Sequence, residues 1–409
     1  MKVSYKLIHR LFTNEPISYK KGSIFGEKFA INSFMLKIKI VNSKKDLKQF
    51  VDLPWSIYNS KSHPNWVPPL KVSVYEALDT KKNPFYKRAE IQLFIVSKNN
   101  KNVGRIAAIQ NHAHNDFHND KVGFYGFFEC IEDQEVADTL FMEAQSWLKA
   151  RGLTSMRGPM NPSTNHECGL LVRGQSQHPT IMTTWNPKYY VDLHEKAQLN
   201  ASKDLVAYYL PTNSFGSLPE KVKTNAEKLR ETSKFTFRDF DLKNFDRDVG
   251  ICFDIYNSAW EKNWGFFPMT KEEFFHTAKD MKMVLDPRFA FIAEKDGQAA
   301  GFMMALPDFN HIFKRIKNGK LFPTGIFKLL IGKKLLKTVR VVTLGVKPEF
   351  RKEGIFSLFT YESFLRAQKY NIIGGEASWI LEDNEAMNKP WRDLGAPLYR
   401  RWRLYERNI

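Results

Sequence analysis

The chain of 409 residues has few cysteines and no long apolar segment. Cys130, Cys168 and Cys252 are odd in number and lack a CxxC or Cys/His spacing, so neither a disulfide framework nor a structural zinc site is predicted. The first 40 residues are interrupted by Pro16 and lack the continuous apolar run of a signal peptide or membrane span. We therefore expect a cytoplasmic protein, and we expect residues 1–34 to be an extension that the core does not need.

The segment from Phe309 to Pro348 contains no acidic residue, in a chain whose net charge is +18. Its cations are interspersed with large apolar side chains, a combination that suits a helix resting on an anionic lipid surface. We predict a basic amphipathic insertion over 311–340, with an anionic membrane surface as partner and a peripheral position at the inner membrane face. Packing of this segment on the protein is the alternative, and nucleic acid is the less favoured partner. The cations are Lys314, Arg315, Lys317, Lys320, Lys328, Lys333, Lys334, Lys337 and Arg340.

What the chain does contain is an internal repeat. The tetrapeptide IYNS at 57–60 recurs at 255–258, and an Asn-Trp pair follows both copies at the same spacing. Further matches, such as Gly104 with Gly301, keep the two copies in step. A repeat this long indicates a duplicated domain and not a solenoid. We predict an amino-terminal domain over 35–210 and a carboxy-terminal domain over 211–409.

Hydrophobic periodicity gives each copy the same mixture of helices and strands. Apolar runs on either side of Gly104 and Gly301 predict antiparallel strand pairs, and Asp296-Gly297 is a typical hairpin turn. Each copy then shows a strand that is followed by a helix. The pattern predicts an α/β fold, with a mixed, mostly antiparallel sheet flanked by helices in each copy.

The most informative polar segment lies between a predicted strand that ends at Val346 and a helix that begins near Ile355. A helix start exposes unpaired N-H groups that bind anions, and Gly354 lets the main chain approach closely. Arg351 and Lys352 lie at this positive end, where cations are unfavourable unless an anion binds. We therefore predict an anion-binding loop.

This loop resembles the acyl-CoA loop of the GNAT superfamily. The pattern R/Q-x-x-G-x-G/A is met by Arg351 and Gly354, with Phe356 at the third position. The stretch from Asn384 to Gly395 resembles the family's next element, N-x-x-A-x-x-x-Y-x-x-x-G-F, with Trp391 at the Tyr position. The resemblance covers the carboxy-terminal copy, and the duplication extends it to the first.

The resemblance implies a tandem GNAT-fold N-acyltransferase. Such an enzyme moves an acyl group from acyl-CoA, its co-substrate, to an amine, with no metal and no covalent enzyme intermediate. A lipidic acceptor such as a long-chain base is implied by similarity to bacterial ceramide-synthase-like proteins. The residues implied in acyl-CoA binding are Leu344, Gly345, Val346, Arg351, Lys352, Glu353, Gly354, Ile355, Phe356 and Asn384.

The first copy has acidic residues where the second has its basic loop. Its helix begins near Glu132 and Asp133, which complete a helix start by themselves and would repel a diphosphate. Only the carboxy-terminal copy is therefore predicted to hold the donor.

Candidate proton-transfer groups lie elsewhere in the chain. His166 and Glu167 end a polar segment and can accept a proton near neutral pH, as can Glu129 at a strand end, although a solvated turn is the alternative for the pair. The resemblance implies a Tyr as the acid that protonates the leaving thiolate. Because Trp391 stands at the position of that Tyr, Tyr399 is the candidate in this chain. The histidines of 112–118 fall in one local loop without the separated ligand pairs of a zinc site, so no metal site is predicted.

Two other functions remain open. Fem-type transferases, which use aminoacyl-tRNA, also pair two GNAT-like units and need a basic surface that faces RNA. A non-catalytic protein, with both units degenerate, would use the basic segment to bind lipid or nucleic acid.

Overall fold

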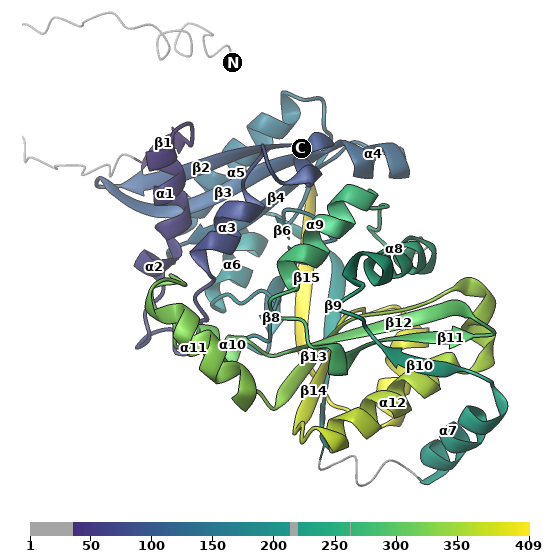
Figure 1. The fold of residues 1–409 in the computed structure, drawn as a ribbon. Helices are drawn as coiled ribbons and strands as arrows, with labels where there is room; N and C mark the ends of the chain where they lie inside the picture. The colour runs from purple at the N-terminus through teal and green to yellow at the C-terminus, as the bar shows by residue number, and fades with distance from the viewer. Residues whose placement is uncertain (1–35, 213–219, 262) are drawn as a thin grey trace, which may run out of the picture. The chain divides into compact units, whose positions relative to one another are not determined.

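The computed structural model describes residues 36–212, 220–261 and 263–409, and the predicted extension over 1–34 lies outside them (Figure 1). The strands of the first copy are β1 (Leu36–Ile40), β2 (Ala89–Lys98), β3 (Lys101–Asn111), β4 (Val122–Cys130), β5 (Ser155–Gly158), β6 (Met160–Asn161), β7 (Glu167–Cys168), β8 (Leu170–Arg173) and β9 (Asn200–Pro211). Its helices are α1 (Lys44–Asp52), α2 (Pro54–Ile57), α3 (Lys71–Ala77), η2 (Pro84–Lys87), α4 (His112–His118), α5 (Gln134–Lys149) and α6 (Tyr189–Lys196).

The second copy repeats this order with added helices before its fourth strand. Its strands are β10 (Thr236–Asp239), β11 (Ala290–Lys295), β12 (Gln298–Pro307), β13 (Thr338–Val346), β14 (Gly374–Leu381) and β15 (Leu398–Asn408). Its helices are α7 (Glu220–Thr232), α8 (Phe245–Trp260), α9 (Lys271–Met281), η4 (Pro287–Phe289), α10 (Asn310–Phe313), α11 (Thr324–Gly332), η5 (Lys333–Leu335), η6 (Pro348–Glu353), α12 (Ile355–Lys369) and α13 (Glu385–Asp393).

The two long hairpins follow from local sequence. Asn99-Asn100 joins β2 to β3, and Asp296-Gly297 joins β11 to β12, with φ between 50° and 78° at all four residues. A two-residue turn of this kind needs positive φ at both positions, which Asn, Asp and Gly adopt most readily. The predicted hairpin turn at Asp296-Gly297 is confirmed.

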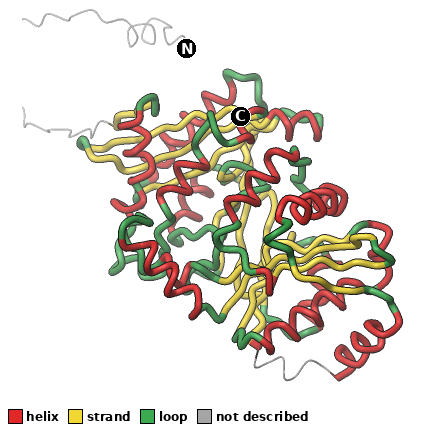
Figure 2. Tube along the Cα trace, in the orientation of Figure 1, coloured by secondary structure: helices red, strands yellow, loops and turns green. Residues whose placement is uncertain are grey.

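Helices cover both faces of the sheet, as the tube in Figure 2 shows. In the first copy, α5 and α6 pack on one face and α1 and α3 on the other. In the second copy, α12 packs on one face and α8, α10 and α11 on the other. The predicted α/β fold with a mixed, mostly antiparallel sheet is confirmed, because among the described strands only β4 with β5 and β13 with β14 run parallel.

The last strands of the two copies are exchanged. The sheet runs β1-β2-β3-β4-β5-β15-β9-β14-β13-β12-β11-β10, so β15 from the end of the chain pairs with β5 of the first copy. In turn β9 lies between β15 and β14. The two predicted sheets are therefore one continuous sheet. The boundary at 210/211 coincides with the end of β9 in the chain, but β9 itself lies beside a strand of the second copy.

Trp402 on β15 provides a test of this exchange. Its side chain is fully buried in a cluster made largely of first-copy residues, and its Nε1 donates to the carbonyl of Thr184 at 2.9 Å. We expect Trp402→Ala to lower the free energy of unfolding by about 3–5 kcal/mol, because it leaves a cavity and an unpaired carbonyl. Calorimetry with circular dichroism should show one earlier transition; a separate early transition of the second copy alone would contradict a shared core.

Candidate active site

A wedge opens between the parallel strands β13 and β14. The two strands pair from Thr338↔Gly374 to Val341↔Ala377 and then diverge. Beyond Val341, among the described residues, no strand pairs with the edge of β13 that faces β14. Unpaired backbone N-H and C=O groups along a strand edge are suited to bind an extended, amide-containing ligand. The predicted donor strand, 344–346, lies on this open edge.

The predicted anion-binding loop lies at the end of the same strand. After β13 the chain forms the short helix η6, passes through Gly354 at φ 74° and enters α12. No side chain caps the amino terminus of α12, and its first turn has no acidic residue. The loop therefore precedes a helix whose first amides are free of side-chain competitors, as an anion site requires.

The side chains of the loop divide into structural and free groups. Arg351 donates to the carbonyls of Val346 at 3.2 Å and Ala259 at 3.0 Å, which fastens the loop to β13 and α8. Glu353 is paired with Lys295, and Lys352 is exposed. Arg351 therefore holds the loop in place, and the exposed ammonium of Lys352 is the cation that a bound anion can meet.

The first residues of α12 contribute main chain to this end of the wedge, not polar side chains. Ile355 is 1% exposed and packs into the core, and Phe356 is half-buried. Leu229 of α7 covers one side of Gly354, since a Cβ there would lie 2.5 Å from its Cδ2. Asn384, at the start of α13, accepts from the amide of Met387 at 3.2 Å and so caps that helix.

The equivalent wedge of the first copy is filled by its own chain. A Cβ on Gly126 of β4 would lie 1.6 Å from the carbonyl oxygen of Met160, so the segment 160–161 runs directly over that strand. The amide of Phe127 donates to the side chain of Asn161 at 2.6 Å. Asp133 caps α5 by accepting from two of its first amides. Neither the strand edge nor the helix start of the first copy is free for a donor.

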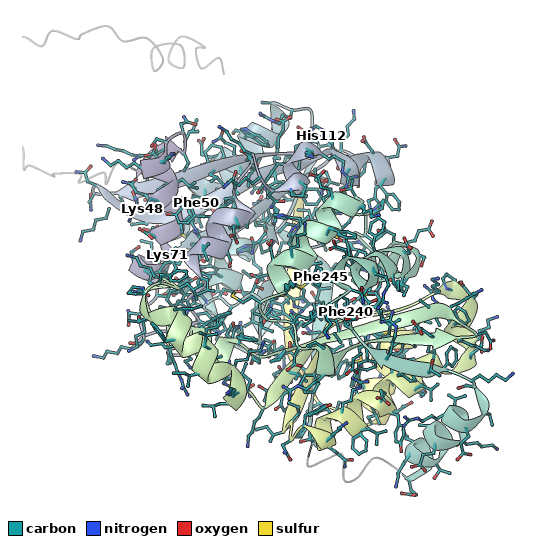
Figure 3. The ribbon with its side chains drawn as sticks, in the orientation of Figure 1. Lys48, Phe50, Lys71, His112, Phe240 and Phe245 are labelled. Atoms are coloured by element: carbon teal, nitrogen blue, oxygen red, sulfur yellow. The ribbon has the colours of Figure 1, made fainter. Side chains whose placement is uncertain are left out.

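An apolar cavity of about 280 Å³ lies on one side of the open wedge. Both strands of the wedge reach it, through Val342 and Thr343 of β13 and Trp379 of β14. Its walls are aromatic and aliphatic side chains from α8, α9, the strands of the second copy and the loop between β10 and α8. Among them are Phe240 of that loop and Phe245 of α8, whose rings lie 5.7 Å apart (Figure 3). Such walls suit a hydrocarbon chain.

A smaller cavity of about 70 Å³ also reaches the wedge, through Leu344 and Ala377. Ser363 of α12 and Trp391 of α13 line it as well. The indole N-H of Trp391 on this cavity, and the hydroxyl of Thr343 on the larger one, are buried polar groups without a hydrogen-bond partner in the described protein. Unpaired polar groups beside a cavity are typical of a site that is completed by a ligand.

His166 and Glu167 lie together on the wall of the larger cavity. The chain that fills the first wedge continues to them, so the first copy supplies polar groups to a cavity of the second. Burial lowers the pKa of His166 to about 4, and its Nδ1 lies 2.8 Å from the hydroxyl of Ser163. Burial raises the pKa of Glu167, and the charge of Arg340 opposes that rise. A carboxylate with a raised pKa is better matched to accepting a proton near neutral pH.

Glu129 lies elsewhere, in the interior of the first copy. Tyr58 and Tyr190 both donate to its Oε2, and Arg105 lies 3.6 Å from its Oε1. Burial raises the pKa of Glu129 as well. Its side chain does not line either cavity at the wedge. The structure thus does not bring Glu129 together with His166 and Glu167.

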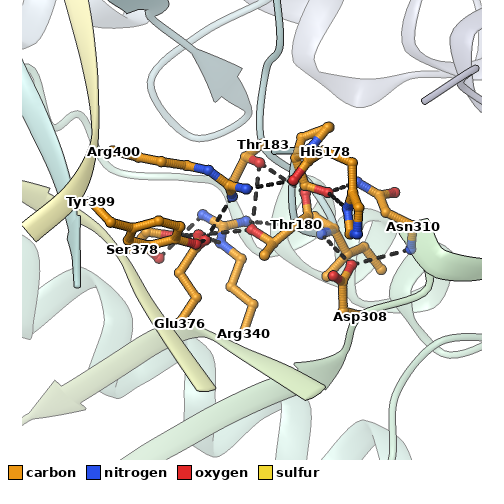
Figure 4. Close-up of polar contacts among 12 residues, drawn as sticks. His178, Thr180, Thr183, Asp308, Asn310, Arg340, Glu376, Ser378, Tyr399 and Arg400 are labelled. Carbon is orange, nitrogen blue, oxygen red and sulfur yellow. Dashed lines mark hydrogen bonds and ion pairs between the residues drawn. The ribbon is translucent and has the colours of Figure 1, made fainter. Parts of the chain in front are cut away.

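Tyr399 belongs to a buried polar network that the sequence did not reveal (Figure 4). Its hydroxyl donates to Glu376, a fully buried carboxylate on β14, and burial raises the pKa of Tyr399. Arg400 donates to the same Glu376 oxygen at 2.9 Å, and Thr180 donates to the other at 2.7 Å. A hydroxyl engaged in this way is poorly placed to protonate a thiolate, so the role of Tyr399 as acid stays a prediction.

The predicted basic insertion over 311–340 is wrong at its last residue, Arg340, which is not an exposed cation. Arg340 is 2% exposed, lies on β13 and donates to the carbonyls of Ile181 and Met182 at 2.9 and 2.8 Å. Its register partner on β14 is Glu376. Arg340 is therefore an internal residue that fixes a first-copy loop to the second copy, and not a cation of the surface.

The histidine-rich segment forms α4. His114 is buried, with a pKa lowered to about 3 by burial, and His118 bonds to the carbonyl of Phe266 at 2.8 Å. Across 36–212, 220–261 and 263–409, no group of three or more His, Cys, Asp or Glu side chains is placed to hold a metal ion. His114 packs in the interior, whereas His112 is half-buried beside Glu90.

Comparisons with known proteins agree with this geometry. No family model matches the chain. It is 34% identical over 381 residues to the bacterial ceramide synthase of Caulobacter vibrioides, covering 91% of this chain and 98% of that protein. It is 32% identical over 383 residues to protein YghO of Escherichia coli, covering 92% and 96%. A tandem GNAT protein from the clavulanic acid biosynthesis pathway aligns with a TM-score of 0.52 at 11% identity, covering 91% of this chain and 98% of that one, and this likeness shows the fold.

Proposed function

We propose that this protein, which has the tandem GNAT fold and belongs to the family of the bacterial ceramide synthase and YghO, transfers an acyl group from acyl-CoA to the amine of a long-chain base. Its general activity is that of an acyltransferase. The observation that carries the proposal is the open wedge of the second copy, with a free helix start at one end and an apolar cavity beside it.

The donor is proposed to bind along β13. The diphosphate lies at the amides around Gly354, with Lys352 beside it, and the pantetheine arm pairs with the strand edge at 344–346. The thioester then reaches the point where β13 and β14 diverge. The unpaired hydroxyl of Thr343 lies on the cavity side of this point.

The reaction needs one nucleophile and one base. The neutral amine attacks the thioester carbonyl, a C–N bond forms, the C–S bond breaks and CoA leaves as a thiolate. Glu167 takes the proton that the nitrogen loses, and it is positioned for this because it lines the cavity and has a raised pKa. The thiolate takes its proton from solvent, since a thiol with a pKa near 8.5 is a tolerable leaving group at neutral pH.

The acceptor class follows from the cavity and the relatives. The cavity walls are predominantly apolar, with Glu167 and Arg340 as charged groups among the lining residues. An amine that carries a long alkyl chain can place the chain against these walls and the nitrogen near Glu167. A Fem-type reaction would need a polar, RNA-facing entrance, and nothing in the cavity lining favours it over the lipid acceptor.

A direct assay tests this proposal. We expect the purified protein to release CoA thiol from palmitoyl-CoA only when a long-chain base such as sphinganine is added, with an N-acylated product in the mass spectrum. Acetyl-CoA is the control for acyl length, and aminoacyl-tRNA is the control for the Fem-type alternative. Release of CoA thiol that does not depend on added sphinganine would overturn the proposal. Transfer of an aminoacyl group from aminoacyl-tRNA, in place of acyl transfer from palmitoyl-CoA, would overturn it as well.

A further inference from the structure

The insertion between β12 and β13 has two different faces. Toward the protein, Ile312, Ile316 and Leu329 are buried, and Ile312 and Leu329 belong to the cluster that also holds residues of α8. A Cβ on Gly332 would lie 2.8 Å from Ile312, so α11 is closely packed on α10. The segment is thus packed on the second copy, as expected under the alternative that this segment packs on the protein.

Its outward face is apolar, which packing on the protein alone does not explain. Of the thirteen large hydrophobic side chains exposed among the described residues, five fall in the short span of 322–335. Three of them, Phe327, Leu330 and Ile331, have the spacing of one helix face and are 60–69% exposed. Phe322 and Leu335, at 71% and 67%, extend this surface at the two ends of α11. We call these five residues the apolar face of α11.

Exposed cations lie within and on both sides of the apolar face in the sequence, and no acidic residue of the same segment offsets them. Exposed lysines lie within α11 at Lys328, directly after it at Lys333 and Lys334, and near its ends at Lys320 and Lys337. Arg340 is excluded from this set because it is buried in the network with Glu376. Residues 309–348 contain no acid, so the segment itself carries charge of one sign, and Asp286 from outside it lies within electrostatic reach of Lys333.

We propose that the apolar face of α11 and its lysines dock on an anionic lipid bilayer, with the apolar side chains in the headgroup region and the ammonium groups on lipid phosphates. Exposed apolar side chains ringed by lysines are the chemistry of an interfacial helix. Across the described ranges no helix is long and apolar enough to cross a membrane, so this contact is peripheral.

The docking surface adds a membrane partner to the proposed function. Binding of the surface to lipid does not depend on that proposal; only the purpose of the binding, access to a lipid acceptor, rests on it. A long-chain base is an amphiphile that resides in a leaflet. The inward face of the insertion packs in the same cluster as Phe240 and Phe245, which line the cavity. A protein held on the bilayer by α11 therefore has its acceptor cavity close to the membrane that supplies the acceptor.

Vesicle co-sedimentation of the full chain tests the surface without any catalysis. We expect binding to vesicles that contain phosphatidylglycerol, with roughly 10-fold weaker binding to pure phosphatidylcholine and a marked loss at high salt. The combined variant Phe327→Ser, Leu330→Ser and Ile331→Ser should bind anionic vesicles about 10-fold more weakly. The pair Lys333→Glu and Lys334→Glu should lose a similar factor.

Matched controls change exposed residues elsewhere on the protein. Met142→Ser with Leu242→Ser controls for the apolar change, and Lys44→Glu with Lys45→Glu controls for the charge reversal. Equal losses in the controls, or unchanged binding in the α11 variants, would overturn the proposal. Retained vesicle binding together with lost tRNA binding in the lysine variants would assign the surface to nucleic acid instead. Acyl transfer to a detergent-solubilised acceptor should stay intact in all four variants, which separates this test from that of the proposed function.

Discussion

Glu167→Gln is expected to lower kcat by about 10²- to 10⁴-fold while the affinity for acyl-CoA stays the same, because the amide keeps the shape of the carboxylate but cannot take the proton of the acceptor amine. Steady-state kinetics of acyl transfer, with acyl-CoA binding by calorimetry, measures both quantities. In the unaltered protein the activity should fall as the pH is lowered through the pKa of Glu167, which burial places above its usual value. The variant should lose that dependence on pH.

The matched control is Glu129→Gln. Glu129 is also a buried carboxyl group with a raised pKa, but it is held by Tyr58, Tyr190 and Arg105 inside the first copy. This variant should lower the melting temperature, since it weakens the partner of a buried arginine, and it should leave kcat largely intact in the folded protein. A large loss of kcat in Glu129→Gln with full activity in Glu167→Gln would reverse the assignment of the base.

Gly354→Asp is expected to weaken acyl-CoA binding by about 10- to 100-fold relative to Gly354→Asn, the factor that loss of a few charge-assisted contacts produces. Both side chains have the same shape, both meet Leu229, and both must adopt the positive φ of this position, which Asp and Asn tolerate best among the larger residues. The variants differ in charge alone, and Asp would cap α12 at the position where the diphosphate is proposed to bind. Calorimetric titration with acyl-CoA gives the two affinities.

Equal affinities for the two Gly354 variants would mean that no anion binds at the start of α12. The corresponding test in the first copy compares Glu132→Gln with the unaltered protein. The affinity for acyl-CoA and the stability should both stay nearly the same, because the wedge of that copy is filled by Met160 and Asn161. Improved acyl-CoA binding on removal of the Glu132 charge would place a donor in the first copy and contradict the division between the copies.

The parts that sequence could predict are those with a local cause. An Asp-Gly pair between two apolar runs gives a hairpin turn, and a glycine between a strand and an apolar-periodic segment gives a helix start. The difference between the helix starts of the two copies could also be predicted, because Asp133 caps its own helix by accepting from the amides that follow it. Each of these features depends on a few consecutive residues.

The parts that sequence could not predict depend on which distant segments meet. The alternation of apolar residues in β9 and β15 is the same whether a strand closes its own copy or the other one, so the exchange leaves no local signal. Arg340 was grouped with the surface cations because charge alone says nothing of burial, and its pairing with Glu376 arises only when β13 and β14 align. The segment that fills the first wedge likewise reads as a polar turn.

The exchange of β9 and β15 bears on why both copies persist. A duplicated unit whose own wedge is filled would ordinarily be free to decay, yet here its final strand, β9, pairs with β14, one of the two strands of the open wedge. The first copy also contributes Glu167 to the cavity of the second copy. Because each copy completes its part of the sheet with a strand from the other, we expect that neither copy expressed alone would keep an intact sheet.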